Sequence, residues 1–152
     1  MRLTAKTSYA IRALIYLAIM YPGKSPVSIK DVSAEEGISR IYLEQIFNDL
    51  KNAGLVKSVR GPRGGYLLAK QPGKINVYEA ITAIEGKVSS VGCRLERAGG
   101  RTCAQAGRCV SKEVWDEVTR RIQSTLEGFS LGYLAEKAVK KDPGKQRRRA
   151  SG

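Results

Sequence analysis

The chain has 152 residues, a formal net charge of +13, three cysteines and no histidine. Its length suits one domain with an appendage, and its 42% hydrophobic content is ordinary for a globular protein. The N-terminus lacks a secretory signal pattern, and the longest apolar run, 10–21, is broken by Arg12 and too short to span a bilayer. We therefore expect a soluble, cytoplasmic protein with no membrane partner, whose thiols stay reduced.

Basic charge gathers in two parts of the chain. Residues 1–77 carry 12 basic and 5 acidic side chains, residues 78–139 carry 9 and 8, and residues 140–152 carry 6 and 1. A positive field of this kind attracts a polyanion and releases its counterions on binding. Charge alone does not distinguish DNA from RNA or from an anionic membrane, so the partner must be inferred from motifs.

Helical spacing, caps and breakers predict three helices at the start of the chain. Each opens at a residue whose side-chain oxygen can accept a hydrogen bond from the first turn. The second opens with a pattern, Ser28 to Asp31, that resembles a capping box. The third has an apolar stripe of Leu43, Ile46, Phe47 and Leu50. The predicted ranges are 4–20, 28–36 and 39–54.

Two short strands joined by a glycine-rich turn follow these helices. Residues 55–59 alternate like a half-buried strand, residues 61–65 read Gly-Pro-Arg-Gly-Gly, and residues 66–69 form the returning strand. A helix, a helix–turn–helix and a hairpin, in this order, are typical of winged helix–turn–helix DNA-binding domains. The predicted fold is mainly α with a small β-hairpin wing.

Three further helices are predicted at 76–84, 111–129 and 131–140. Asn76 with Glu79 forms a capping box, and Ser111 caps the longest helix. That long helix could pack on its own wing domain or form the seam of a dimer, which suits a palindromic operator. Residues 140–152 are predicted to be a disordered basic tail. The apolar face of the long helix consists of Trp115, Val118, Ile122, Leu126 and Phe129.

The candidate DNA-binding residues lie in the third helix and in the wing. A recognition helix presents polar side chains near its start to base edges in the major groove. Arginines that flank a glycine-rich turn can approach a groove or a phosphate closely. Glu44 could accept a hydrogen bond from a cytosine amino group or neutralise a basic neighbour. The full set is Ser39, Arg40, Tyr42, Glu44, Gln45, Arg60, Gly61, Pro62, Arg63 and Gly64.

The cysteines stand in a stretch, 86–110, that shows no persuasive periodicity and is predicted to lack secondary structure. Nine residues separate Cys93 from Cys103 and five separate Cys103 from Cys109, among glycines and arginines rather than apolar packing partners. Thiolates bind soft metals and iron–sulfur clusters, or react with oxidants. All three are candidate ligands of an iron–sulfur cluster. Zinc is the alternative, although the closely paired cysteines of most structural zinc sites are missing.

The chain has no histidine, which removes the commonest general base and the commonest non-thiolate metal ligand. No serine or cysteine belongs to a recognisable nucleophile–base arrangement. We therefore expect a binding protein rather than an enzyme. A fourth metal ligand would be an oxygen ligand, a small molecule or a residue of a second chain.

Over roughly residues 1–135 the chain resembles the Rrf-type winged-helix transcription regulators, most closely their iron–sulfur branch. The resemblance rests on residues 1–4, 42–47, 54–56, 59–68 and 110–115, together with the three cysteines. It implies a homodimer joined by the helix 111–129 that binds a symmetric double-stranded DNA operator. It also implies a cluster, [2Fe–2S] in preference to [4Fe–4S], held by the cysteines. The DNA-reading positions that it indicates are Ser39, Tyr42, Glu44, Gln45 and Arg60.

The function implied by the resemblance is transcription regulation by cluster status, most directly of iron–sulfur assembly genes. A nitric-oxide-sensing or redox-sensing repressor is the alternative within the family, and a zinc-stabilised interaction module is the alternative from another class. The positions of the family's known fourth ligands hold Lys112 and Ser8 here, and the first cysteine spacing is longer than usual. Oxygen candidates are Glu96, Ser111 and Glu113. The expected organisation is a winged helix–turn–helix domain at 1–77, a cluster-binding loop with dimerisation helices at 78–139, and the tail at 140–152.

Overall fold

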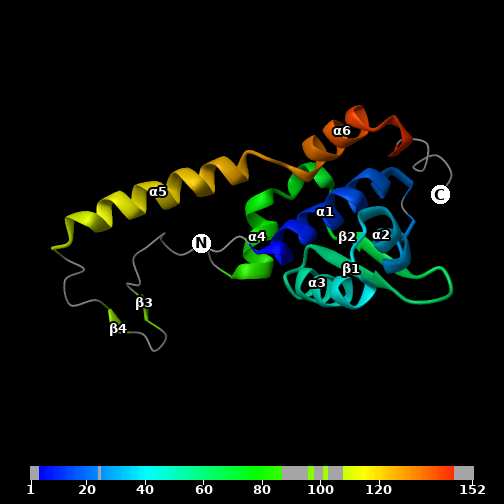
Figure 1. Ribbon diagram of the computed structural model, residues 1–152, viewed down its shortest axis with the longest axis horizontal. Coiled ribbons are helices and arrows are strands. Elements are labelled where there is room, and N and C mark those ends of the chain that lie inside the picture. Colours follow the sequence, from blue (N-terminus) through cyan, green and yellow to red (C-terminus); the bar gives the residue numbers. More distant parts are fainter. Residues whose placement is uncertain (1–3, 24, 87–95, 98–100, 103–107, 146–152) are drawn as a thin grey trace.

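A computed structural model describes residues 4–23, 25–86, 96–97, 101–102 and 108–145. Most of these residues are helical, and an antiparallel hairpin lies beside the third helix (Figure 1). The predicted mainly helical fold with a hairpin wing is therefore confirmed. In chain order the elements are α1 (Ala5–Met20), η1 (Tyr21–Gly23), α2 (Ile29–Glu36), α3 (Arg40–Asn52), β1 (Val56–Val59), β2 (Gly65–Leu68), η2 (Pro72–Lys74), α4 (Val77–Glu85), β3 (Glu96–Arg97), β4 (Arg101–Thr102), α5 (Val110–Glu127) and α6 (Leu131–Lys141).

The predicted helix starts are confirmed for the first four helices. The side chains of Thr4, Ser28, Ser39 and Asn76 each accept a hydrogen bond from a backbone N–H of the first turn. Of these four helix starts, Asn76 alone has a full capping box. At Ser28 the box is incomplete, because the Asp31 carboxylate accepts a 2.7 Å hydrogen bond from the Ser28 hydroxyl and not from the Ser28 backbone N–H. Local side-chain oxygens thus fix where these helices begin.

The predicted start and end of the longest helix were wrong. Helix α5 begins at Val110 with Cys109 in the cap position, and Ser111 lies inside the first turn. The Ser111 hydroxyl contacts the Cys109 sulfur at 3.0 Å instead of capping the helix. The helix ends at Glu127 because the chain turns at Gly128, so Phe129 lies outside it.

Two further differences concern the segments with the weakest sequence patterns. The stretch 86–110 is not free of secondary structure, because β3 and β4 pair as a minimal antiparallel ladder within it. The first wing strand, Val56–Val59, starts one residue later than the expected 55–59, and the second, Gly65–Leu68, is displaced by one residue from the expected 66–69. Short strands have few residues from which to read an alternation, so their ends are poorly defined by sequence.

Helix α1 is the centre of the hydrophobic core. Helices α3, α4 and α6 and strand β2 all pack against it, and its buried residues share one cluster with those of the helix–turn–helix. The predicted apolar stripe of α3 is confirmed, since its members are fully buried. The largest fully buried side chains include Leu14, Leu43, Ile46, Phe47, Leu50 and Leu131.

Helices α1–α4 and strands β1 and β2 form a compact body, called the head below. The wing hairpin is held to the rest of the head at the base of the hairpin. Strand β1 pairs with β2 so that Val56 faces Leu68 and Val59 faces Gly65. Val27 adds a bridge on the other side of β2, exchanging two backbone hydrogen bonds of 2.8 and 2.9 Å with Tyr66. The Tyr66 ring stacks on Phe47 of α3 with 4.4 Å between centroids. The hairpin therefore keeps a fixed position relative to the recognition helix.

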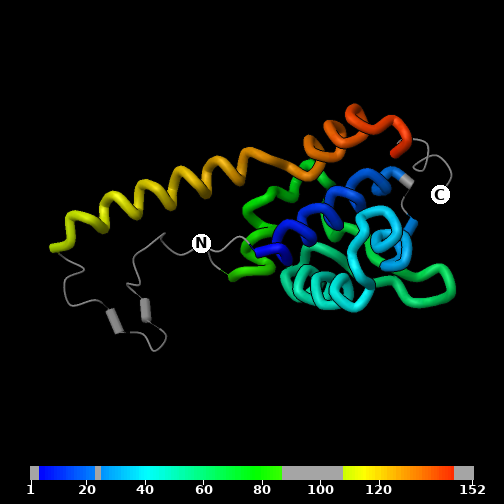
Figure 2. Tube along the Cα trace, in the orientation of Figure 1, coloured from blue at the N-terminus to red at the C-terminus, as the bar shows by residue number. Residues whose placement is uncertain are grey.

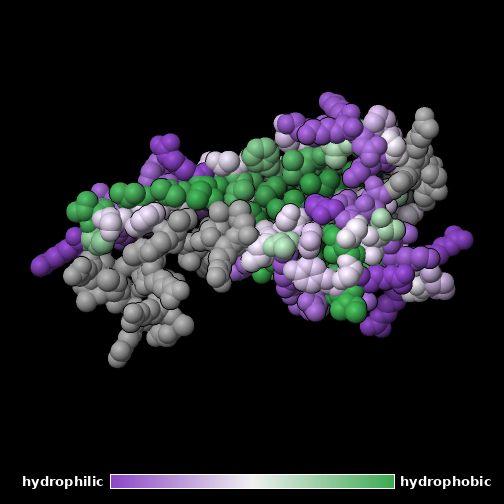
Figure 3. All heavy atoms as spheres, viewed as in Figure 1, coloured by the Kyte–Doolittle hydropathy of each residue, from purple (hydrophilic) through white to green (hydrophobic). Residues whose placement is uncertain are grey.

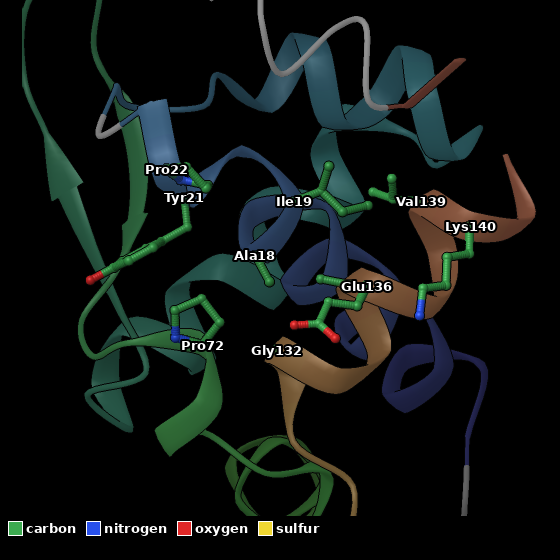
Figure 4. A pocket seen from close by; sticks show the side chains of 10 residues that line it. Ala18, Ile19, Tyr21, Pro22, Pro72, Gly132, Glu136, Val139 and Lys140 are labelled. Atoms are coloured by element: carbon green, nitrogen blue, oxygen red, sulfur yellow. The ribbon is translucent and has the colours of Figure 1, made fainter. Parts of the chain in front are cut away.

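After α5 the chain returns to the head. The Val77 N–H donates to the Phe129 carbonyl at 2.9 Å, and the Leu131 N–H donates to the Ile75 carbonyl at 2.8 Å. Helix α6 then runs along α1 (Figure 2). A hollow of about 470 Å³ lies between the end of α1, η2 and α6, with Ile19, Val139 and Glu136 among its lining (Figure 4).

Helix α5 projects from this body (Figure 1). Only its C-terminal part lies near the head, beside α4, and none of its residues is buried. A continuous hydrophobic strip follows α5 and reaches the head (Figure 3). Of the two predicted alternatives for this helix, packing along its own wing domain is therefore not observed in the described part of the chain.

The first part of the predicted disordered tail is ordered against α2. Lys145 Nζ lies 3.8 Å from a carboxylate oxygen of Glu35 and 3.6 Å from one of Glu36. Residues 146–152 lie outside the described residues.

The base of the wing yields a prediction about stability. A Cβ at Gly65 would lie 2.3 Å from the Val27 carbonyl oxygen, whereas a Cβ at Gly73 meets nothing within 4 Å. We expect Gly65→Ala to lower the free energy of unfolding by about 1–3 kcal/mol, the cost of overpacking. Gly73→Ala is the control and should stay within about 0.5 kcal/mol of the wild type. Urea denaturation measures both, and equal midpoints would contradict the close approach of Val27 to the wing.

Candidate functional site

The start of α3 presents a polar face away from the core. Ser39, Arg40, Glu44 and Gln45 are exposed, and the apolar stripe of the same helix faces inward. The second helix of a helix–turn–helix uses this end to reach base edges in the major groove. These four predicted residues therefore come together on one surface.

Tyr42, the fifth predicted residue of α3, is half-buried. Its ring meets that of Tyr9 edge to face, with 5.7 Å between centroids, and the Arg12 guanidinium lies over Tyr9 at 5.6 Å. An aromatic ring held in this way has few rotamers left. Helix α1 thus positions Tyr42 at the edge of the surface.

Ile41 was missed by the sequence analysis. Its side chain is 73% exposed, the highest exposure of a large apolar residue in α3. An exposed isoleucine on a recognition helix can contact the methyl group of thymine. The available signal was its position off the apolar stripe, next to two predicted reading residues.

The wing tip brings the predicted residues 60–64 into one tight turn. Gly61 has a φ of 121°, and its carbonyl accepts a 2.9 Å hydrogen bond from the Gly64 N–H. A Cβ at Gly64 would lie 2.4 Å from the Val59 carbonyl oxygen, so this turn needs glycine at both positions. Arg60, Pro62 and Arg63 are exposed around it. The turn therefore presents two arginines on a narrow, stiff tip.

The cations of this surface are available to a partner. Among the described residues, no carboxylate forms an ion pair with Arg40, Arg60 or Arg63. Glu44 likewise has no basic partner in the described part of the chain, so neutralisation of a neighbour does not account for it. Hydrophilic residues dominate the wing end of the molecule (Figure 3). Unpaired arginines on a fixed surface suit phosphate oxygens.

One candidate metal ligand, Cys109, lies within the described residues, and Cys93 and Cys103 lie outside them. The Ser111 hydroxyl, at 3.0 Å, and the backbone N–H of Lys112 both lower the pKa of the Cys109 thiol. A cysteine at a helix N-terminus gains thiolate character from the same dipoles. A thiolate is a ligand type that soft metals and iron–sulfur centres take, and among the described residues no group of three or more metal-ligating side chains surrounds Cys109.

The cysteine segment, residues 86–109, connects α4 to α5. Its N-terminal end follows Glu85, the last residue of α4. Its carboxylate accepts hydrogen bonds from Thr4 Oγ1, at 2.5 Å, and from Thr7 Oγ1. These two bonds lower the pKa of Glu85, and the carboxylate also complements the positive end of the α1 dipole. The segment 86–109 thus starts from a residue fixed to α1 and ends at the N-terminus of α5.

The fold and this surface define a winged helix–turn–helix DNA-binding protein. Residues 3–137 match the Rrf2 family, described as iron-dependent transcriptional regulators. The chain belongs to this family, and it is a DNA-binding transcriptional regulator, as predicted. No helix in the described part of the chain is long and apolar enough to cross a membrane.

Named relatives agree with this assignment. The chain is 41% identical over 134 residues to the HTH-type transcriptional regulator IscR of Aliivibrio salmonicida, covering 88% of this chain and 77% of that protein. It is 40% identical over 136 residues to IscR of Xenorhabdus nematophila, covering 90% and 80%.

Solved structures have the same fold. IscR of T. potens is similar with a TM-score of 0.72 and 32% identity, covering 93% of this chain and 91% of that one. CymR, the global cysteine regulator of B. subtilis, gives a TM-score of 0.73 and 31% identity, covering 90% and 98%. The predicted winged helix is thus confirmed by fold as well as by sequence.

Ser39 offers a test that separates helix capping from DNA contact. Its hydroxyl accepts from the Tyr42 N–H at 3.4 Å. Ser39→Ala removes this cap and should lower the free energy of unfolding by about 0.5–2 kcal/mol. Ser39→Asp keeps a capping oxygen and should unfold like the wild type, but its carboxylate should weaken binding to DNA phosphate. Denaturation and titration of a duplex selected from a random-sequence pool measure the two effects. If the Ser39→Asp variant bound the duplex with wild-type affinity, Ser39 would not lie in the DNA interface.

Proposed function

We propose that this protein is a cytoplasmic, homodimeric regulator whose DNA binding responds to an iron–sulfur cluster held by Cys93, Cys103 and Cys109. The observation that carries the proposal is the thiol of Cys109, with its lowered pKa, at the N-terminus of a helix that joins the DNA-binding head. The relatives named IscR support the same assignment. The genes most directly controlled would be those of iron–sulfur assembly.

The ligand set would combine three thiolates with one further group. A [2Fe–2S] cluster is favoured over a [4Fe–4S] cluster, and when bound it supplies an oxygen- and redox-sensitive crosslink between the thiolates. Lys112 cannot ligate as an ammonium group, and its Nζ is paired with Asp116. Ser8, which occupies the other family ligand position, is exposed on α1 and carries no carboxylate. The fourth ligand would therefore be an oxygen atom of Glu96, Ser111 or Glu113, a small molecule or a residue of the second chain.

DNA recognition would divide between two structural elements. The start of α3 would read base edges with Arg40, Glu44 and Gln45, because these side chains are exposed and unpaired among the described residues. Ser39 and Tyr42, at the ends of the exposed surface of α3, would contact the DNA phosphate backbone or the bases beside those that are read. The wing residues 60–64 would follow a groove or the phosphates beside it.

Dimerisation would use the apolar face of α5. An 18-residue helix is about 27 Å long. Its polar side is occupied by ion pairs, including Arg121 Nε to Glu117 Oε1 at 2.6 Å. Val114 is 57% exposed, and Trp115, Val118, Ile122 and Leu126, which share one face of the helix, are only half-buried. An uncovered apolar strip of this length is stabilised by an identical strip from a second protomer.

The cysteine segment would act on the spacing of the two heads. One end follows Glu85, which is bonded to α1, and the other end is the N-terminus of α5. Ordering this segment would therefore constrain the head relative to the dimer helix. The affinity for DNA would change only as far as the ordered segment stabilises one pose over another. In this proposal residues 1–77 bind DNA, residues 78–139 sense and dimerise, and residues 140–152 form a basic tail.

Arg60 tests the wing. Arg60→Ala should weaken binding to the selected duplex by about 1–3 kcal/mol, because alanine cannot replace the arginine's reach into the groove. Lys70→Ala is a matched control, since Lys70 lies beyond β2 in an exposed pair with Glu79 and should leave the affinity unchanged. Fluorescence anisotropy at fixed salt measures both. Equal affinities of the two variants would exclude a wing contact.

The cysteines test the sensing role. Anaerobic reconstitution with ferrous iron and sulfide should give visible absorbance and acid-labile sulfide in the wild type. Cys93→Ala, Cys103→Ala and Cys109→Ala should each abolish the absorbance. A cluster needs four ligand positions, and the chain has only three cysteines to supply them, so none of the three can be replaced by another cysteine. The loaded and apo forms should differ in affinity for the selected duplex. A colourless protein containing zinc, or equal affinities of the two forms, would defeat this function and leave a DNA-binding protein without a cluster switch.

A further inference from the structure

Ile41 is an apolar side chain on the otherwise polar surface at the start of α3. It is the second residue of this helix, and it is 73% exposed. In the described head, one other large apolar side chain is exposed, that of Val59 at 38%. Single exposed apolar residues are common on protein surfaces, so exposure alone assigns no role to Ile41. Its place on the helix is the further evidence.

Helical geometry places Ile41 on the same face as two predicted reading residues. Residues three and four positions apart are neighbours on a helix surface, with about 5–6 Å between their Cβ atoms. Glu44 and Gln45 stand at these two positions after Ile41, and both are exposed. Leu43 and Ile46 are fully buried on the other side of α3, so the helix cannot turn Ile41 toward the core.

The backbone that carries Ile41 is held in place. The Ser39 hydroxyl accepts from the Tyr42 N–H at 3.4 Å, and the Tyr42 ring lies edge to face against Tyr9 of α1. A β-branched side chain in a helix strongly prefers one χ1 rotamer, so Ile41 loses less conformational entropy on contact than a lysine or an arginine would. Ile41 therefore presents its methyl groups in a defined direction before DNA binds.

The chemistry of isoleucine limits what it can recognise. Every base pair presents hydrogen-bonding groups in the major groove, but in unmodified DNA only thymine adds an apolar group, its C5-methyl. The side chain of Ile41 neither donates nor accepts a hydrogen bond, so it would desolvate the polar edge of another base without compensation. Against thymine, two apolar surfaces leave water together.

We propose that Ile41 determines specificity by contacting the C5-methyl group of a thymine that lies about one or two base pairs from the pair read by Glu44 and Gln45. The offset follows from the 5–6 Å between these side chains and a rise of about 3.4 Å per base pair. The proposal deepens the proposed reading role of α3, on which it rests, and does not depend on the cluster. Because Ile41 releases no counterion, its preference for thymine should not change with salt.

Uracil in place of thymine removes this methyl group and leaves base pairing intact. In a duplex selected by the wild-type protein from a random-sequence pool, each thymine is replaced by uracil in turn. At one position for each α3, the replacement should weaken binding by the wild type about fourfold, which corresponds to about 0.8 kcal/mol for one buried group the size of a CH₂. The factor should be the same at low and at high salt.

Ile41→Ala completes a double-mutant cycle with the uracil duplex. This variant should bind the thymine duplex about fourfold more weakly than the wild type and should no longer distinguish thymine from uracil at that position. It should unfold at the same urea concentration as the wild type, because Ile41 is exposed. Val59→Ala removes the other exposed large apolar side chain of the head, and as the matched control it should keep the full uracil penalty.

Equal uracil penalties for the wild type and Ile41→Ala at every position would overturn the proposal, because another group would then read the methyl. A selected duplex in which the wild type tolerates uracil everywhere would overturn it as well. In either case, a changed base preference of Glu44→Ala would leave the reading role of α3 intact. Failure of the wild-type protein to select any duplex would instead reject that role.

Discussion

Burial of α1 is the constraint on which the rest of this protein depends. Its apolar residues are covered by α3, α4, α6 and β2, and they belong to one hydrophobic cluster with the buried residues of those elements. Leu14 and Ala13 are fully buried on this helix. Its buried side chains include small alanines as well as large apolar residues, and the small ones let neighbouring helices approach closely. The recognition helix and the wing therefore inherit their positions from a helix that makes no predicted DNA contact.

Polar contacts around α1 add direction to this packing. Carboxylates from three helices reach its side chains: Glu85 reaches Thr4 and Thr7, Asp49 reaches Lys6 at 2.6 Å, and Glu36 reaches Arg12 at 2.9 Å. Such pairs contribute little stability individually. Because the buried residues of these helices share one hydrophobic cluster, the head is expected to move as one body. A signal from the cysteine segment would then change the placement of whole heads rather than the shape of the recognition helix.

The charges and thiols of the chain divide its functions between regions. Free arginines gather on the wing and the start of α3, and the sulfur of Cys109 stands at the far end of α5 (Figure 1). The apolar side of α5 connects them, which makes the dimer helix the physical route between sensing and DNA binding in the function that we propose.

Features that depend on neighbouring residues could be predicted from the amino-acid sequence. Capping oxygens at Thr4, Ser39 and Asn76, the stripe of α3 and the glycine-rich wing turn were all readable, because their hydrogen bonds and periodicity act over a few positions. The projection of α5 and the ion pairs of Lys145 with α2, in contrast, are visible only in the folded chain. Each of these depends on groups far apart in the chain, whose contacts form only when α1 is buried.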